Sequence, residues 1–323
     1  MLTPNDFSKG SQVEIQQLVN GLSLGSLYAL IAVGYTVVYG IVQLINFAHG
    51  EIFMIGGFGS LTTWMLLGKP EWSLPMALFV LLPLMLIGGI IASVGTAVLM
   101  ERLAYRPLRG APRLAPLISA IGISIALQEL VRLGYGMIPG FPDARKAVPF
   151  PHVEGISGKS TNIGGAVIQN SALFTIGALI VCTIALYLYV NKTKMGRAMQ
   201  ATSQDPDTAR LMGINVDRVI MSAFAIGGTL AAVAGLAHGL QVSNVDFKMG
   251  FMAGLKAFTA AVLGGIGNIN GAVLGGLVLG LVETFAADFG PAAWKDVWAF
   301  VLLILVLVFR PQGLLGARVV DRA

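Results

Sequence analysis

The sequence predicts an all-α, polytopic membrane protein with eight or nine transmembrane helices, some of them broken or re-entrant. Of its 323 residues, 55% are hydrophobic and only 11% are charged, which does not fit the surface of a soluble protein. The mean hydropathy is +0.78. Apolar runs of about 20 residues, the length that crosses about 30 Å of hydrocarbon, recur along the chain.

Eight apolar runs are the candidate membrane spans. In chain order they are Leu18–Gly40, Ile52–Leu67, Leu74–Met100, Leu114–Tyr135, Ala172–Val190, Val219–Leu240, Ala272–Phe289 and Val297–Phe309. A ninth stretch, Gly250–Gly267, is more polar and carries Lys256. A charge inside a span is costly, so the sequence leaves open whether this stretch crosses the membrane.

The basic residues predict the sidedness of the loops. Twelve of the 21 Lys and Arg residues lie in three short segments: residues 102–113, residues 192–218 and residues 310–322. Basic loops stay on the cytoplasmic side, which places the segment 192–218 and the C-terminus in the cytoplasm and the loop 136–170 outside. Counting three spans back from Arg102 puts the N-terminus outside, and a re-entrant run would reverse this. The net charge of +5 therefore indicates membrane orientation and not nucleic-acid binding.

The cytoplasmic segment contains a short helix whose two ends are marked. Asp205 suits the N-cap and Pro206 the first helical position, while Gly213 suits the left-handed position after the helix. The residues between these signals include Asp207, Arg210, Leu211 and Met212. A structured helix on the water face predicts a docking partner. An amphipathic interfacial helix without a partner is the alternative.

Polar residues inside the apolar runs are candidates for function. Asn46, His49 and Glu51 interrupt the run from Ile41 to Leu67 and predict a helix break. The break either lines a pathway, because irregular backbone at depth survives only beside protein or a cavity, or is a polar turn at the membrane surface. Lys256 is a further candidate for the pathway or a break. The three histidines lack the spacing of metal ligands on one helix, and we expect no metal and no cofactor.

Small residues predict close helix packing. Gly267, Gly271 and Gly275 recur at intervals of four residues, a pattern that lets helices approach closely. Glu283 follows this stripe near the expected outer end of its span, where we expect its side chain to reach toward the interface. The chain contains no pairing of a nucleophile with a base, so we predict that it is not an enzyme.

A set of motifs in order along nearly the whole chain resembles the permease subunits of branched-chain amino acid ABC transporters, specifically the first of the two paired permeases. The motifs are Gly21–Leu30, Gly34–Gly40, Ile45–Glu51, Glu101–Arg109, Met195–Ala198, Leu211–Asn215, Lys256–Gly267 and Arg310–Gly316. The resemblance implies one transmembrane permease domain over residues 1–323, in a bacterial cytoplasmic (inner) membrane.

The resemblance also implies the partners. These would be a second paired permease, two cytoplasmic ATPase subunits that carry out hydrolysis, an extracytoplasmic substrate-binding protein and the membrane lipid. By position, the helix at Asp205–Gly213 would be the coupling helix that inserts into a groove of an ATPase. The solute would be a branched-chain or related amino acid, with urea or short amides as alternatives.

The rival prediction is a carrier or channel for a small polar solute, driven by an ion gradient. Such a carrier needs coupling carboxylates near the middle of the membrane. Glu51 and Glu283 are instead expected near the ends of their spans, which favours the ATP-driven importer.

Overall fold

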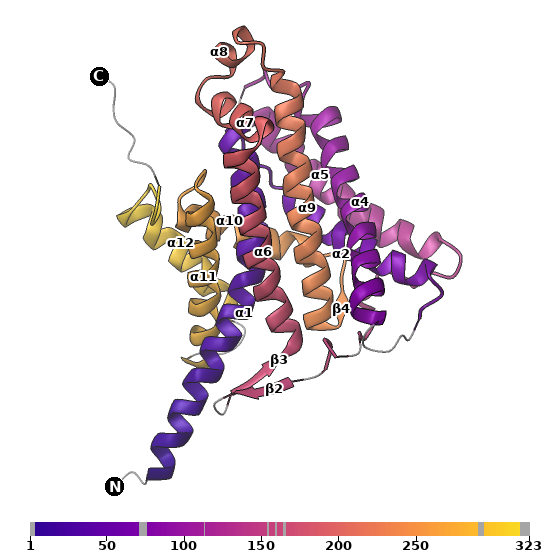
Figure 1. Cartoon of the computed structure of the whole chain (residues 1–323), viewed down its shortest axis with the longest axis vertical. Coiled ribbons are helices and arrows are strands. Elements are labelled where there is room, and N and C mark those ends of the chain that lie inside the picture. The colour runs from indigo at the N-terminus through magenta and orange to yellow at the C-terminus, as the bar shows by residue number, and fades with distance from the viewer. Residues whose placement is uncertain are drawn as a thin grey trace.

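The computed structural model describes residues 4–70, 76–112, 114–153, 155–158, 160–163, 166–289 and 294–316. Helices form most of it. They are α1 (Pro4–Val42), α2 (His49–Leu66), α4 (Leu82–Met100), α5 (Leu114–Gly134), α6 (Asn170–Lys192), α7 (Lys194–Gln204), α8 (Pro206–Leu211), α9 (Val216–Val242), α10 (Met249–Gly264), α11 (Ile269–Phe289) and α12 (Lys295–Phe309). Figure 1 shows the long helices side by side, with the N-terminus and α8 at opposite ends of the long axis.

Shorter elements extend or connect these helices. The π-helical turns η1 (Ala77–Leu81) and η2 (Glu101–Tyr105) extend the two ends of α4, and the 3-10 turn η3 (Tyr135–Met137) follows α5. Strands β2 (Ser160–Ile163) and β3 (Ala166–Gln169) pair antiparallel. Strand β1 (Val148–Pro149) pairs with β4 (Asn244–Val245), which follows α9. In Figure 1 the β2–β3 pair lies far from α8.

The all-α membrane fold is confirmed. Among the described residues, six helices are long and apolar enough to cross a membrane: Ile15–Val42, Ala77–Tyr105, Leu114–Met137, Asn170–Lys192, Val216–Val242 and Ile269–Ala287. The runs expected at Ile52–Leu67, Gly250–Gly267 and Val297–Phe309 correspond to the shorter helices α2, α10 and α12. The number of spans stays a prediction.

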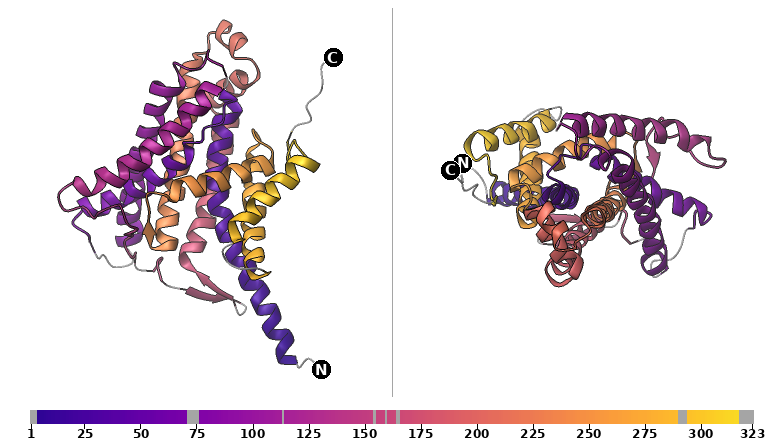
Figure 2. Two further views of the ribbon diagram at one scale, coloured as in Figure 1. Left: turned by 180° about the vertical axis from the view of Figure 1, so that it is seen from behind. Right: turned by 90° about the horizontal axis from the view of Figure 1, so that it is seen from above.

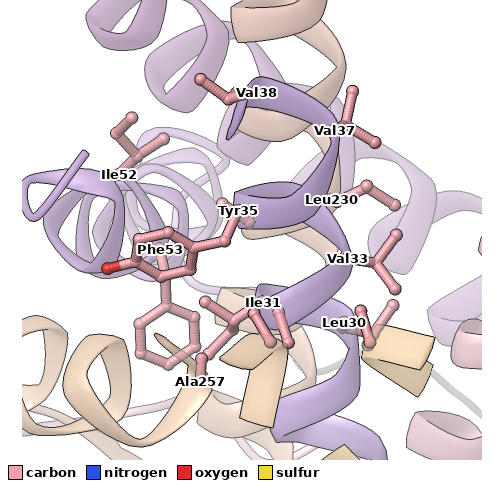
Figure 3. Packing of buried hydrophobic residues seen from close by; sticks show 14 of the residues in the cluster. Leu30, Ile31, Val33, Tyr35, Val37, Val38, Ile52, Phe53, Leu230 and Ala257 are labelled. Atoms are coloured by element: carbon pink, nitrogen blue, oxygen red, sulfur yellow. The ribbon is translucent and has the colours of Figure 1, made fainter. Parts of the chain in front are cut away.

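Helices α1 and α9 form the centre of the molecule. Within their most apolar windows, 78% of the α1 residues and 72% of the α9 residues are buried, against 22% in α5 and 17% in α6. Figure 3 shows α1 side chains such as Ile31 and Tyr35 packed beside Phe53 of α2 and Ala257 of α10. The helices with low burial present apolar side chains outward, as lipid-facing helices do.

The described parts of the three basic segments lie toward one end of the molecule, which we call the basic end. Arg106, after α4, forms an ion pair with Asp217 at the start of α9. Glycines Gly40 and Gly267 lie close enough that a Cβ on the first would be 3.7 Å from the second. The chain after α12 returns to the end of α10, where Leu314 N donates to Leu263 O at 2.8 Å. The positive charges predict that the C-terminus lies in the cytoplasm, but residues 317–323 lie outside the described residues.

Glycines allow the backbones of the central helices to contact one another directly. The stripe on α11 has two sides: Gly271 and Gly275 face α10, and Gly276 and Gly280 face α1. Gly267 lies between α10 and α11 with a φ of 95°, next to Gly40 of α1 and not within a helix. Its role is to allow a left-handed turn.

Enlarging Gly280 is expected to separate α1 from α11. A Cβ added at Gly280 would lie 2.6 Å from the carbonyl oxygen of Gly21, and overpacking of this kind costs about 1–3 kcal/mol. We expect Gly280→Ala to lower the thermal unfolding temperature of the detergent-solubilised protein. The matched control is Gly177→Ala on α6, where no described atom lies within 4 Å of the added Cβ. Equal effects of the two changes would contradict the assigned contact.

Candidate functional site

The helix pair α7–α8 projects from the basic end and forms the first part of the candidate site. Thr193 is the N-cap of helix α7, and its hydroxyl accepts a hydrogen bond from Gly196 N at 3.0 Å. Met199 and Thr202 on this helix are buried, so α7 is packed onto the membrane helices. Figure 2 shows from behind that α8 lies beyond α7, at the tip of the molecule.

The N-terminus of α8 is capped as the sequence predicts. The Asp205 carboxylate accepts hydrogen bonds from Asp207 N at 2.9 Å and Thr208 N at 3.1 Å, and from the Thr208 hydroxyl. The Thr208 hydroxyl and these amides bond to the ionised form and hold the pKa of Asp205 below its ordinary value. The cap is therefore complete above the ordinary pKa and is lost only as the pH falls through the lowered one.

The C-terminus of α8 closes in a Schellman motif, with Gly213 in the left-handed conformation at φ 82°. Gly213 N donates to Arg210 O at 3.0 Å, and Ile214 N donates to Ala209 O at 3.0 Å, the two bonds that define this motif. Arg210 also bonds Asp207 at 2.8 Å across the helix. The helix of six residues is thus fixed at both ends.

The tip of α8 carries two large apolar side chains in solvent. Leu211 is 87% exposed and Met212 is 77% exposed. Apolar side chains presented on a rigid, capped turn are the usual anchors of a helix that docks in a groove. The docking role predicted for this helix stays a prediction.

Charged residues beside the helix pair connect the loop after α4 to α9. Arg106 and Arg109 both pair with Asp217, and Arg109 also pairs with the buried Glu101. The Arg109 Nη1 to Asp217 Oδ1 distance is 2.5 Å. Sequence reasoning used these arginines for sidedness and as part of the motif Glu101–Arg109, and predicted no pairing for them. No local pattern in the sequence indicates that they pair with Asp217, because Arg109 and Asp217 are 108 positions apart.

The predicted break between Ile41 and Leu67 is confirmed, and its polar residues are buried. Helix α1 ends at Val42 and α2 begins at His49. Asn46, His49 and Glu51 are at most 2% exposed, so a polar turn open at the membrane surface does not describe them. The Asn46 side chain accepts hydrogen bonds from Tyr105 OH and Ala48 N, both at 3.1 Å.

Glycines make room for the His49 ring. A Cβ on Gly227 of α9 would lie 3.2 Å from the ring, and one on Gly34 of α1 would also clash with it. Tyr35 meets the ring edge-on with 4.6 Å between ring centres. Within the described part of the chain, His49 Nε2 has no hydrogen-bond partner. The imidazole is thus enclosed between three helices.

Glu51 ties the peripheral helix α5 to α2. Its Oε1 accepts hydrogen bonds from Ser124 Oγ at 3.0 Å and Gln128 Nε2 at 2.9 Å. Both donors lie on α5, where only 22% of the residues in the most apolar window are buried. A cavity of about 610 Å³ with a mainly apolar lining lies along the same seam between α2, α4 and α5. The polar contacts of Glu51 therefore hold α5 where apolar contact is limited.

Glu51→Gln is expected to preserve the fold, because the amide oxygen still accepts from Ser124 and Gln128. Glu51→Leu removes the acceptor and leaves buried donors unpaired, at a cost of about 1–3 kcal/mol. We expect only the leucine variant to lower the yield of monodisperse protein on size exclusion. If the glutamine variant folds normally and loses solute uptake, the charge itself has a role in transport.

A charged cluster surrounds the buried Lys256, and of its members sequence reasoning named only Lys256 as a candidate for the pathway. Lys256 Nζ lies 2.8 Å from Glu283 Oε1 and 2.5 Å from Asp296 Oδ1. Tyr28 OH donates to Glu283 Oε2 at 2.9 Å, and Lys295 Nζ lies 3.2 Å from Glu283 Oε1. Four helices, α1, α10, α11 and α12, meet at this cluster.

The expectation that Glu283 extends to the membrane interface is wrong. The Glu283 side chain is 0% exposed, because α11 turns this position inward against α1 and α10. Lys256 lies inside α10 and not at a helix break. A buried charge is tolerated only when it is paired, and here each buried charge has its partner.

The fold and these buried polar groups define a polytopic α-helical membrane protein. Residues 17–307 match the family described as branched-chain amino acid transport system / permease component. The chain belongs to this family.

Curated relatives match along almost the whole chain. It is 44% identical to the high-affinity branched-chain amino acid transport system permease protein BraD of Pseudomonas aeruginosa, over 95% of this chain and 97% of the relative. It is 43% identical to the permease protein LivH of the corresponding system of Escherichia coli, with the same coverage. A solved structure, PsaBC from Streptococcus pneumoniae in complex with Fab, matches 92% of this chain and 91% of that chain with a TM-score of 0.47 and 12% identity.

Proposed function

We propose that this chain is a permease subunit of an ATP-driven importer for branched-chain or related amino acids. Membership of the permease family supports the class. The observation that carries the mechanism is the capped helix α8, with Leu211 and Met212 exposed at its tip. A short helix fixed at both ends transmits a push without bending, which is what coupling to a separate motor requires.

In this proposal hydrolysis takes place in two ATPase subunits at the basic end, which faces the cytoplasm. A second, paired permease completes the membrane part, and a substrate-binding protein delivers the solute from outside. The α8 tip docks in an ATPase groove. Closure of the ATPases moves α7 and α8 together, and the ion pairs of Asp217 with Arg106 and Arg109 carry the motion to α4 and α9.

Crosslinking tests the proposal directly. With Cys182 replaced by alanine, a cysteine is introduced at Leu211 or Met212 and a photoactivatable thiol crosslinker is attached in native membranes that contain the complete transport system. Mass spectrometry identifies the captured protein. Capture of an ATPase supports the coupling role. Labelling from the cytoplasmic side without capture of an ATPase overturns it.

The double variant Asp205→Ala, Gly213→Val is expected to insert normally and to lose coupled uptake. The first change removes the N-cap of α8. The second places a β-branched residue at positive φ, a conformation that costs about 1–3 kcal/mol. Uptake of radiolabelled leucine in membrane vesicles with ATP gives the measurement, and Asp205→Asn, which keeps the cap, is the control. Unchanged uptake in the double variant would show that the order of α8 is not needed.

A further inference from the structure

Helix α7 is anchored at one end. Thr193 is the one residue between α6 and α7 and has an extended backbone, with φ −95° and ψ 157°. Its hydroxyl donates to Tyr189 O at 2.7 Å. Gly196 lets the first turn of α7 lie directly against α6, because a Cβ at this position would clash with the carbonyl oxygen of Val190. Figure 1 shows α7 folded back beside the ends of α6 and α1. The joint at Thr193 therefore holds the first turn of α7 in place.

The second half of α7 is separated from α1 by a cavity of about 120 Å³. Gln200 and Ser203 line this cavity from α7, Gly40 and Ile41 line it from α1, and Ile269 lines it from the start of α11. Packed helices normally leave few voids larger than a water molecule, and a cavity of about 150 Å³ already holds a benzene molecule. The contact between α7 and α1 is therefore incomplete, whereas the contact of the first turn with α6 is close.

The α1 wall of this cavity carries a hydroxyl that lacks a hydrogen bond. Thr36 lines the cavity and is 1% exposed, and its Oγ1 has no hydrogen-bond partner among the described residues. Thr202 of α7, next to Ser203, is fully buried, and its Oγ1 also lacks a partner in the described part of the chain. A buried hydroxyl without a partner is costly. An approach of the two walls would bring the polar side chains of Gln200 and Ser203 closer to Thr36.

We propose that α7 tilts into this cavity when the ATPases close, and that it thereby presses on α1 and the start of α11. This inference rests on the proposed function and names the place where the movement enters the bundle. Helix α7 has 11 residues, so about 16 Å of helix extends from the anchor at 1.5 Å per residue. Asp205 joins the far end of α7 to α8, so a push on α8 reaches the unanchored half of α7 first. The cavity is open without ATP and closed with ATP bound.

Disulfide formation across the cavity tests the movement in the assembled transporter. The background is Cys182→Ala, and the test pair is Ile41→Cys with Ser203→Cys, one residue from each wall. Copper phenanthroline catalyses the oxidation in membranes that contain the complete transport system, without nucleotide and with ATP plus vanadate. A disulfide needs its two Cα atoms within about 7 Å of each other, so we expect the bond to form at least about tenfold faster with ATP plus vanadate. Each single cysteine variant, labelled with N-ethylmaleimide, controls for a change in thiol reactivity.

A side chain that fills the cavity gives an independent test. Ser203→Leu places a larger apolar side chain between the walls, and the control Gln204→Leu places the same side chain at an exposed position of α7. Filling a cavity commonly raises stability. We therefore expect Ser203→Leu to unfold in detergent at or above the temperature of the parent, to retain the ATPase on co-purification and to lose most of its ATP-driven leucine uptake. A change that only damaged the fold would lower the unfolding temperature together with the uptake.

Two results would overturn the proposed movement: equal rates of disulfide formation in the two nucleotide states, or leucine uptake in Ser203→Leu equal to that in Gln204→Leu. In either case, capture of an ATPase from Leu211 or Met212 would still support the proposed function. If the Cys182→Ala parent shows no ATP-driven uptake of amino acids, the proposed function fails, and this inference fails with it.

Discussion

Glu283→Leu is expected to cause the largest loss of stability of any single change in the interior. The Glu283 carboxylate forms ion pairs with Lys256 and Lys295 and accepts a hydrogen bond from Tyr28. Its removal leaves Asp296 as the one acidic partner of the buried Lys256 ammonium among the described residues. Breaking a buried ion pair by removing one partner costs about 3–5 kcal/mol. The measurements are the thermal unfolding temperature in detergent and the yield of monodisperse protein.

The double variant Lys256→Met, Glu283→Leu distinguishes two causes of the instability: the cost of burying an unpaired charge, and the loss of the attraction between Lys256 and Glu283. Removal of both charges leaves no buried ammonium to compensate, so we expect the double variant to regain much of the stability lost in Glu283→Leu. An unfolding temperature of the double variant at or below that of the single variant would show that the pair stabilises the fold outright.

The second large effect is expected at the tip of α8. The double variant Leu211→Asp, Met212→Asp places two charges where the proposed docking needs apolar contact. Each residue that anchors an interface contributes about 2 kcal/mol or more, which is about a thirtyfold change in affinity. We expect ATP-driven uptake to fall to background while the permease still inserts and folds, because both side chains lie in solvent in the isolated chain.

The matched control is Gln204→Glu, which adds a negative charge to an exposed position of the same segment. Co-purification of the ATPase with each variant gives a second readout that does not depend on transport. Retention of the ATPase by the double variant at parental levels would refute docking through this tip.

Local signals in the sequence were sufficient for the ends of α8. Asp205, Pro206 and Gly213 act within a few residues of their own positions, so a reader of the sequence can predict the N-cap and the Schellman turn. The break at Asn46, His49 and Glu51 was predicted for the same reason, since polar residues interrupt an apolar run. The burial of these side chains was not predicted, because it depends on Gly34, Gly227 and α5, which lie elsewhere in the chain.

Long-range contacts explain what sequence reasoning missed. The position of Glu283 along its run suggested the outer interface, and only the packing of α11 against α1 shows that it pairs with Lys256. Gly267 shared the spacing of the packing glycines, yet the helix begins two residues after it. The positions of Glu51 and Glu283 along their spans therefore no longer distinguish an ATP-driven importer from a carrier driven by an ion gradient. Membership of the permease family makes that distinction.

The contact between α1 and α11 has a consequence for biosynthesis. Helix α1 leaves the ribosome before α11, yet Tyr28 has its partner, Glu283, 255 positions later, and Gly21 and Gly25 also pack against α11. Until α11 is inserted, this face of α1 lacks the contacts that it makes with α11 in the folded chain. Lys256 also enters the membrane ahead of the carboxylate that neutralises it. The order of synthesis thus makes α11 the helix that commits the nascent chain to its final assembly.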